Sequence, residues 1–194
     1  MSDLSDFVAP DRTDLPTFTL RSYLPGDGPA INQAVTSSFE HLRPWLSWAT
    51  DDQTVAQAEA LARMFRSRYL VNEDFTIGIW SPDGDRLLGG TGFHLRGSPI
   101  GHQVAEIGMW IRADVAGAGL GTAVLQAMLR WGFSEWPWER LEWRCDHRNE
   151  ASRRTAEKAG MRHEGSLRGD KPEVGEGRCT TLVFGLTRED ERPD

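Results

Sequence analysis

Apolar positions recur along the chain with two different periods, which together predict a series of strands and helices. Apolar residues at every second position are typical of a half-buried strand, whereas apolar residues three or four positions apart mark one face of a helix. Strands are expected at residues 17–21, 75–80, 86–95, 104–111, 141–145, 162–167 and 179–186. Helices are expected at residues 30–38, from about 55 to 69, from the glycine-rich loop at 117–121 to about 133, and between Asn149 and Gly160.

Capping residues and turns support the ends of these elements. Asp51 and Asp52 are placed to cap the second helix. Asn149 is placed to cap the last helix, which Gly160 closes in the left-handed conformation. The apolar side chains of the second helix fall on one face and comprise Val55, Ala58, Ala62, Phe65 and Tyr69. Turns are expected at residues 25–29, 82–85 and 97–99.

The order of these elements predicts one mixed α/β (α+β) domain. The 194 residues suffice for one domain with a sizeable core, and 39% hydrophobic and 26% charged residues are ordinary for a globular protein. We expect a single domain over residues 17–187, with a flexible lead-in at 1–16 and a polar tail at 188–194. The sequence shows no internal repeat and no low-complexity tract.

Composition narrows the class of function. No apolar run is long enough to span a bilayer, so no membrane partner is expected, and no secretory signal is visible. Cys145 and Cys179 make no disulfide framework, which favours the cytoplasm. The five histidines lack the spacing of a metal site, so no metal is expected. A net charge of −7 disfavours nucleic acid as a partner; it suits a cationic amine, or it only aids solubility.

The most informative stretch is the glycine-rich loop, Gly117-Ala118-Gly119-Leu120-Gly121, which lies between a strand and a helix. Glycines let the backbone approach a ligand closely, and the amides of a helix N-terminus attract an anion. The loop and Thr122 therefore suit a phosphate or pyrophosphate, although a mere tight turn would use the same glycines. A Rossmann site is disfavoured because residues 112–116 separate the strand from the first glycine, and no Gly-Lys-Ser/Thr indicates a P-loop.

With the segments that follow this loop, the chain resembles the GNAT acetyltransferases. Glu106–Ile111 and Ala116–Gly121 look like the central strand and pyrophosphate loop of that family, usually Q/R-x-x-G-x-G/A. Asn149–Arg154 and Ala156–Met161 look like its second CoA-contacting motif. His41–Trp48 looks like the corresponding segment of the RimJ/RimL branch, which acetylates α-amino groups of ribosomal proteins. The resemblance implies the GNAT fold, a mixed and mostly antiparallel sheet that splays at its centre and is flanked by about four helices.

The resemblance also implies acetyl-CoA as co-substrate and a set of residues that bind it. Backbone amides of Met109, Trp110 and Ile111 would pair with pantetheine as an added strand does. The loop and helix start would hold the pyrophosphate, and the side chains of the second motif would contact CoA. These residues are Ala116, Gly117, Ala118, Gly119, Leu120, Gly121, Thr122, Asn149, Ser152, Arg154 and Lys158. Arg154 and Lys158, with Arg153, could meet the 3′-phosphate or simply form a solvated face.

Two positions depart from the family pattern. The first position of the loop is Ala116 rather than Gln or Arg, which removes one side chain but leaves the backbone amides. Ala156 stands where many GNAT enzymes place the tyrosine that protonates the leaving thiolate. Ser152 lies one helical turn after the helix start, so its hydroxyl could act as that acid, as a serine does in the RimL-like branch; otherwise it only satisfies its own helix end.

The attacking amine must be neutral, so a proton acceptor is expected close to it. Glu106 is the leading candidate because family members often use an acid on this strand; the alternative is a structural carboxylate. His94 ends the preceding strand and could sit opposite Glu106 in the acceptor site, although a lone histidine on a strand is more often structural. Trp45 and Trp48 are expected to line the acceptor groove, since this region sets specificity across the superfamily.

The expected activity is therefore N-acetylation of an α-amine on a protein or peptide by direct attack in a ternary complex. A small-molecule amine, such as an aminoglycoside or a polyamine, is the second hypothesis. A non-catalytic CoA-binding module is the third. The sequence names neither the acceptor nor the length of the acyl group. Relatives often form dimers, so a homodimer is possible.

Overall fold

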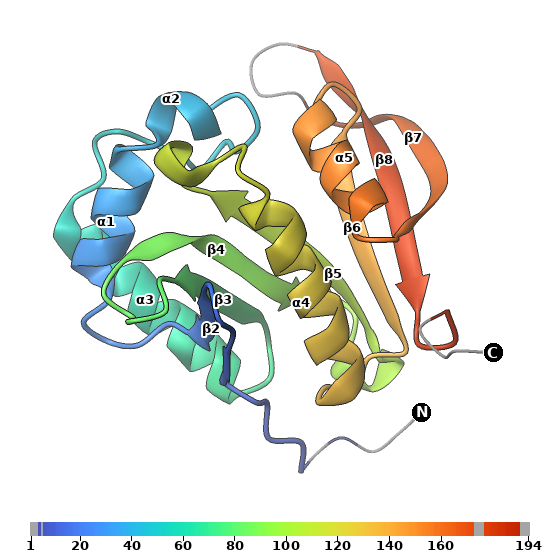
Figure 1. The fold of residues 1–194 in the computed structure, drawn as a ribbon, viewed down its shortest axis with the longest axis horizontal. Helices are drawn as coiled ribbons and strands as arrows, with labels where there is room; N and C mark the ends of the chain where they lie inside the picture. The colour runs from blue at the N-terminus through green and yellow to red at the C-terminus, as the bar shows by residue number, and fades with distance from the viewer. Residues whose placement is uncertain (1–3, 5, 173–176, 191–194) are drawn as a thin grey trace.

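The computed structural model describes residues 4, 6–172 and 177–190, which fold around one eight-stranded sheet (Figure 1). Its strands lie in the order β1-β2-β3-β4-β5-β6-β8-β7. Neighbouring strands are antiparallel except β5 and β6, which are parallel. The predicted mixed and mostly antiparallel sheet is therefore confirmed. The strands are β1 (Arg12–Asp14), β2 (Thr19–Ser22), β3 (Phe75–Trp80), β4 (Leu87–His94), β5 (Val104–Ile111), β6 (Arg140–Asp146), β7 (Arg162–Pro172) and β8 (Arg178–Thr187).

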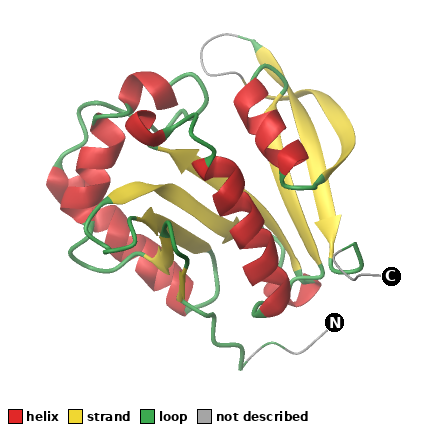
Figure 2. Ribbon diagram, viewed as in Figure 1, coloured by secondary structure: helices red, strands yellow, loops and turns green. Residues whose placement is uncertain are grey.

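Helices cover both faces of the sheet (Figure 2). One apolar cluster lies on each face of the sheet. On one face α1 and α3 pack with Trp80 and Leu87, and on the other α4 packs with Ile77, Phe93 and Ile107. The described residues form five α-helices rather than about four, because one turn forms in the aromatic connection before Pro44. They are α1 (Gly28–Thr36), α2 (Phe39–Leu42), α3 (Val55–Leu70), α4 (Leu120–Ser134) and α5 (Glu150–Lys158), with 3₁₀ turns at Ile100–His102 and Ala113–Val115.

The start of α3 differs from the sequence prediction. Thr54, and not Asp51 or Asp52, is its N-cap: Thr54 Oγ1 accepts from Gln57 N at 3.2 Å, and Gln57 Oε1 accepts from Thr54 N at 2.8 Å. This reciprocal capping box satisfies two backbone donors at once, which a lone aspartate cannot do. Val55, in the first turn, is consequently 48% exposed, whereas the other predicted apolar positions of this helix are buried or partly buried.

Parts of the predicted lead-in and tail that the structure describes make contacts with the rest of the fold. Arg12–Asp14 pairs with β2, and Pro10 O accepts a hydrogen bond from Tyr69 Oη at 2.6 Å. A three-residue edge strand is too short to show a period in the sequence. At the other end, Arg188 donates to Trp138 O at 2.7 Å and to Trp136 O at 3.1 Å. Within the described residues, the predicted lead-in and tail are therefore partly tied to the fold.

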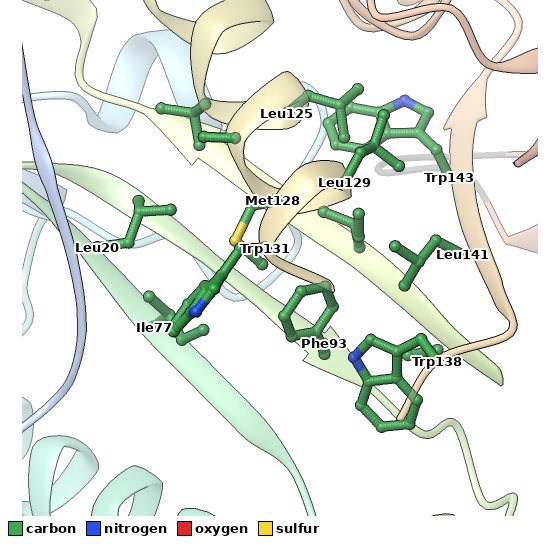
Figure 3. Close-up of a cluster of buried hydrophobic side chains, with 14 of the residues drawn as sticks. Leu20, Ile77, Phe93, Leu125, Met128, Leu129, Trp131, Trp138, Leu141 and Trp143 are labelled. Carbon is green, nitrogen blue, oxygen red and sulfur yellow. The ribbon is translucent and has the colours of Figure 1, made fainter. Parts of the chain in front are cut away.

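The core lies mainly between the sheet and α4 (Figure 3). Trp131, Trp136 and Trp138 are at most 4% exposed, so all three pack in this core. The rings of Trp136 and Trp138 stack with centroids 5.9 Å apart, and Phe93 packs against both. Among the described helices, none has the length and apolar content that a membrane span needs. The core therefore packs α4 against β5, and the candidate site is built at their junction.

Candidate functional site

Strands β5 and β6 pair over three residues and then diverge (Figure 1). The pairing starts at Val104–Arg140 and ends at Glu106–Glu142. Beyond that point β5 continues along β4 as far as Ile111, and β6 continues along β8 as far as Asp146. The facing backbone edges, residues 108–111 and 143–146, are thus free of each other. Such edges are suited to an extended ligand that pairs as a strand does. The predicted splay is confirmed.

The glycine loop lies at the open end of this divergence. Gly117 has φ of 79° and Gly119 has φ of 89°, the left-handed region that glycine adopts without strain. Nothing lies within 4 Å of where a side chain would start at either position, so their backbone is open to a ligand. A side chain at Gly121 would start 3.9 Å from both Met109 Sδ and Thr155 Oγ1, which places the first turn of α4 beside β5 and α5.

The first turn of α4 has the features of an anion site. The first backbone N–H groups of a helix have no intrahelical partner, and the helix dipole places partial positive charge there. The first turn of α4 has no acidic side chain to occupy this site, and Gly119 caps it without a side-chain hydrogen bond. The amides of Leu120, Gly121 and Thr122 therefore have no intrahelical acceptor, an arrangement that suits an anion.

Buried Arg112, which the sequence reasoning missed, holds the segment that leads into the loop. The residue is 3% exposed, and its guanidinium donates to Asp114 at 3.1 Å and to Gln33 of α1. The hydrogen bonds from Arg112 hold the pKa of Asp114 below its usual range, against a smaller opposing effect of burial. Next in the chain, Ala113 N donates to Ser38 Oγ at 3.1 Å. The loop is therefore anchored to the helix α1 and its end.

Glu106 lies where the pairing of β5 and β6 ends, and cations surround its carboxylate. Its side chain is 14% exposed. Oε1 accepts a hydrogen bond from Arg96 Nη2 at 2.7 Å, and Oε2 lies 3.8 Å from Arg144 Nε. The structure thus puts the predicted base at the vertex of the splay, but with both oxygens facing guanidinium groups.

His94 is the register partner of Glu106 across β4 and β5. Its Nδ1 lies 2.9 Å from Asp74 Oδ1. Its Nε2 extends over Gly108, where a side chain would start only 2.9 Å from that nitrogen. Burial works against the charge of Asp74, but hydrogen bonds from His94 and Thr76 and the charges of His94 and Arg68 outweigh it, so the pKa of Asp74 is lowered. Asp74 precedes β3, and nothing in its sequence neighbourhood marked it.

Ser152 is tied to the opposite side of the divergence. Its backbone N–H donates to Asn149 Oδ1 at 3.0 Å, which confirms Asn149 as the N-cap of α5. Its hydroxyl does not serve its own helix end, because Oγ accepts from Trp143 Nε1 of β6 at 3.1 Å. Burial raises the pKa of the Cys145 thiol, and a hydrogen bond with Ser152 opposes that rise. The serine hydroxyl therefore sits between two β6 side chains at the splayed edge.

The cationic face of α5 is mostly paired within the helix. Arg154 contacts Glu150 at 3.0 Å, and Arg153 lies 3.4 Å from Glu150 and 3.6 Å from Glu157. Lys158 is exposed and makes no ion pair with the described residues. Of the predicted cations on this helix, Lys158 is therefore the most available to a phosphate.

One tryptophan of the α2–α3 connection, Trp48, contacts β5. Trp48 is 51% exposed, and its ring centroid lies 6.1 Å from that of Trp110 in an edge-to-face contact. The indole of Trp110 covers Gly90, where a side chain would start 2.4 Å from Nε1. Trp45 is 39% exposed. Because alternate residues of a strand share a face, Trp110 lies on the same face of β5 as Glu106 and Gly108.

Among the described residues, no group of three His, Cys, Asp or Glu side chains forms a metal site.

Comparisons with known proteins agree with this geometry. Residues 17–162 match a family model described as an acetyltransferase (GNAT) domain. The uncharacterized N-acetyltransferase YoaA of Bacillus subtilis (strain 168) is 30% identical over 116 residues. That match covers 60% of this chain and 64% of YoaA, so the chain spans just under two thirds of this relative.

Three solved structures share the fold. A ribosomal-protein-S5-alanine acetyltransferase from Vibrio fischeri has a TM-score of 0.82 at 14% identity, covering 95% of this chain and all of that one. RimL, the ribosomal L7/L12 α-N-protein acetyltransferase, in complex with CoA, has a TM-score of 0.82 at 17% identity, covering 92% and 98%. The microcin C7 self-immunity acetyltransferase MccE, with acetyl-CoA and AMP, has 0.79 at 15%, covering 89% and 93%.

Proposed function

Because this chain belongs to the GNAT acetyltransferase family, we propose that it transfers an acetyl group from acetyl-CoA to an amine. We further propose that the acceptor is the α-amino group of a protein or peptide. The observation that carries the proposal is the divergence of β5 and β6 beyond Glu106–Glu142, with the glycine loop at its open end. In this proposal the enzyme works in the cytoplasm, where its two buried cysteines stay reduced.

The residues around the divergence fit acetyl-CoA. The free edge of β5 at Met109–Ile111 suits the pantetheine amides, and the amides of residues 117–122 suit the pyrophosphate. Open space beside Gly117 and Gly119 leaves room for the phosphates. The backbone of Ala116 still belongs to this loop although its side chain adds no contact, and Lys158 suits the 3′-phosphate. When bound, acetyl-CoA supplies an acyl thioester.

The protein's own residues position the amine, take a proton from it, and give a proton to the leaving sulfur. Glu106 and His94 are the two candidate proton acceptors, and both lie on the face of the sheet that Trp48 approaches. Ser152, hydrogen-bonded to Trp143 at the splayed edge of β6, is the candidate proton donor to sulfur. This placement fits direct attack in a ternary complex, because the candidate proton acceptors lie on β4 and β5, while Ser152 of α5 is held against β6, on the other side of the divergence.

An α-amine suits this site better than a lysine side chain. An α-amine has a pKa of about 7.7–8.0 and a lysine amine of about 10.4, so a single weak base deprotonates the former far more readily near neutral pH. Two of the solved structures that share the fold are named as ribosomal-protein acetyltransferases. The fold neighbour MccE, named for immunity to microcin C7, favours a small-molecule amine as the second candidate.

A thiol-release assay with acetyl-CoA tests the proposal. Three acceptor sets are compared: peptides with free N-termini, lysine peptides with blocked N-termini, and small polyamines and aminoglycosides. Release confined to free N-termini supports the α-amine acceptor, and release confined to the small amines supports the second candidate. Calorimetric binding of CoA without release in any set would overturn catalysis and indicate a CoA-binding module.

A further inference from the structure

We propose that His94, oriented by Asp74, is the catalytic residue that takes the proton from the acceptor amine, and that Glu106 is a positioning residue. This inference rests on the proposed acetyl transfer. It starts from a buried pair: the side chains of His94 and Asp74 are 17% and 14% exposed, and Nδ1 lies 2.9 Å from Oδ1.

The pair fixes which imidazole nitrogen is basic. The lowered pKa of Asp74, in which the bonds and charges around it outweigh burial, keeps it a carboxylate at neutral pH. A carboxylate only accepts hydrogen bonds, so Nδ1 of the neutral His94 must be the donor. The lone pair then resides on Nε2. Asp74 is held in turn by Thr76 Oγ1, which donates to Oδ2 at 2.9 Å. This is the arrangement by which a carboxylate fixes the tautomer of a general base.

The basic nitrogen is directed at the open part of β5. Nε2 lies over Gly108, two residues beyond Glu106, where the pairing with β6 has already ended. A side chain at Gly108 would start 2.9 Å from Nε2, and one at Gly92 would start 3.1 Å from the Cε1 atom of the ring. Glycine at these two positions leaves the imidazole room to lie along the sheet without being displaced.

Glu106, by contrast, has both oxygens engaged. Arg96 binds Oε1 at 2.7 Å, and Arg144 lies 3.8 Å from Oε2. An amine would have to compete with a guanidinium to reach either oxygen. Three charged groups surround His94: Asp74 before β3, Glu106 on β5 and Arg96 after β4. The positive charge of Arg68 on α3 helps to lower the pKa of Asp74. Glu106 secures Arg96, whose Nη2 approaches Gly108 as His94 Nε2 does.

In the proposed transfer one C–N bond forms and one C–S bond breaks. The neutral amine nitrogen forms a C–N bond with the acyl carbon, the C–S bond breaks, and its electron pair stays on sulfur. The proton released by the nitrogen moves to Nε2 of His94, and the departing sulfur takes one proton from water or from Ser152, which water restores. The imidazolium returns its proton to water, so the products are the amide and the free thiol.

The rate of thiol release tests the roles, using the most active acceptor amine of the panel. We expect His94→Gln to lower kcat by about 10²–10⁴-fold, the range of general acid–base catalysis, with CoA affinity unchanged. Asp74→Asn should lower kcat about 10-fold or more, because the tautomer is no longer fixed. Glu106→Gln should cost less than His94→Gln. His163→Gln, on exposed β7, is the matched control and should keep the wild-type rate.

Two further readouts separate a catalytic histidine from a structural one. Free imidazole should restore part of the rate of His94→Ala, which a merely structural loss would not allow. Long-range ¹H–¹⁵N correlation spectra of the neutral His94 ring should show Nδ1 protonated and Nε2 unprotonated, and Asp74→Asn should disturb that pattern. A proton on Nε2 would overturn the assignment.

The two proposals fail in different ways. No release by the wild type with any amine would remove the proposed function, while the ring spectra would still decide the tautomer on which the dyad depends. A wild-type enzyme that is active, with His94→Gln within about 3-fold of its rate, would overturn the role of His94 and leave acetyl transfer in place. If only Glu106→Gln lost its rate of thiol release, Glu106 and not His94 would be the base.

Discussion

The indole Nε1 of Trp143 donates a hydrogen bond to Ser152 Oγ across 3.1 Å, which joins β6 to α5 at the point where β6 leaves β5. Trp143 is 5% exposed, so its N–H has little access to water and depends on this acceptor. The bond uses a lone pair of Ser152 Oγ, so the hydroxyl hydrogen stays available to a sulfur acceptor, which in this structure is the neighbouring Cys145 thiol. A proton donor to a leaving thiolate needs a hydroxyl that is fixed in position and can donate to sulfur.

The pair gives a matched test of the serine. We expect Ser152→Ala to lower kcat about 10-fold or more while CoA affinity is kept, because the proton donor is lost. Trp143→Phe removes the same hydrogen bond but leaves the hydroxyl, so it should keep kcat within about 3-fold. Steady-state thiol release and calorimetric titration with CoA measure the two quantities. Equal losses of kcat in both variants would show that the hydrogen bond, and not the hydroxyl, matters.

Gly119 should matter to CoA through its backbone conformation. Its φ of 89° strains any side chain, so Gly119→Ala should cost about 1–2 kcal/mol in keeping the loop shape, which corresponds to a rise of about 5- to 30-fold in the Kd for CoA. Gly84→Ala is the control, because Gly84 has a φ of 81° and equally open space, but lies in the β3–β4 turn. It should lower stability to a similar degree and leave CoA affinity unchanged. An equal rise in Kd for both variants would contradict a role of the loop.

The sequence predicted the fold well where its signals were long and local. Val104–Ile111 was placed to the residue, and Asn149 and Gly160 were identified as the ends of α5. It failed where a signal was short or shared. The β1 strand has three residues, and the capping box at Thr54 competed with the more obvious aspartates nearby. The strand is too short to show a period, and the capping box depends on a reciprocal contact between two residues that neither of them marks alone.

Some features of the candidate site could likewise be predicted from the sequence and others could not. The glycine loop could be predicted because its φ angles demand glycine at fixed positions in the chain. Asp74 and Arg112 could not, because their roles depend on partners brought together by strand pairing: His94 lies 20 residues from Asp74, and Gln33 lies 79 residues from Arg112. The role of Glu106 stays a prediction, and its ion pairs with Arg96 and Arg144 appear only once β4, β5 and β6 are assembled.

Trp48 is expected to contribute to binding of the acceptor. It is half-exposed and touches Trp110 edge-to-face, so an acceptor on this face of β5 would pack against its ring. We expect Trp48→Ala to raise the KM for the acceptor about 10-fold, equivalent to about 1.4 kcal/mol, with the Kd for CoA unchanged. Leu70→Ala, at a more exposed apolar residue at the end of α3, should change neither constant. An unchanged acceptor KM in Trp48→Ala would place the acceptor elsewhere.

Arg188 should stabilise the fold more than its place near the C-terminus suggests. Its guanidinium donates to the carbonyls of Phe133, Trp136 and Trp138, where α4 ends and the chain turns into β6. Removing it leaves these acceptors unpaired in a part-buried place, so Arg188→Met should lower the free energy of unfolding by about 2–4 kcal/mol. Arg162→Met is the control: Arg162 is 72% exposed and pairs with Asp190 at 2.7 Å, and such surface pairs contribute only about 0–1 kcal/mol. Urea unfolding followed by tryptophan fluorescence measures both changes. Similar losses in the two variants would mean that the carbonyls near Arg188 find water once the guanidinium is gone, and that the C-terminal segment does not brace α4.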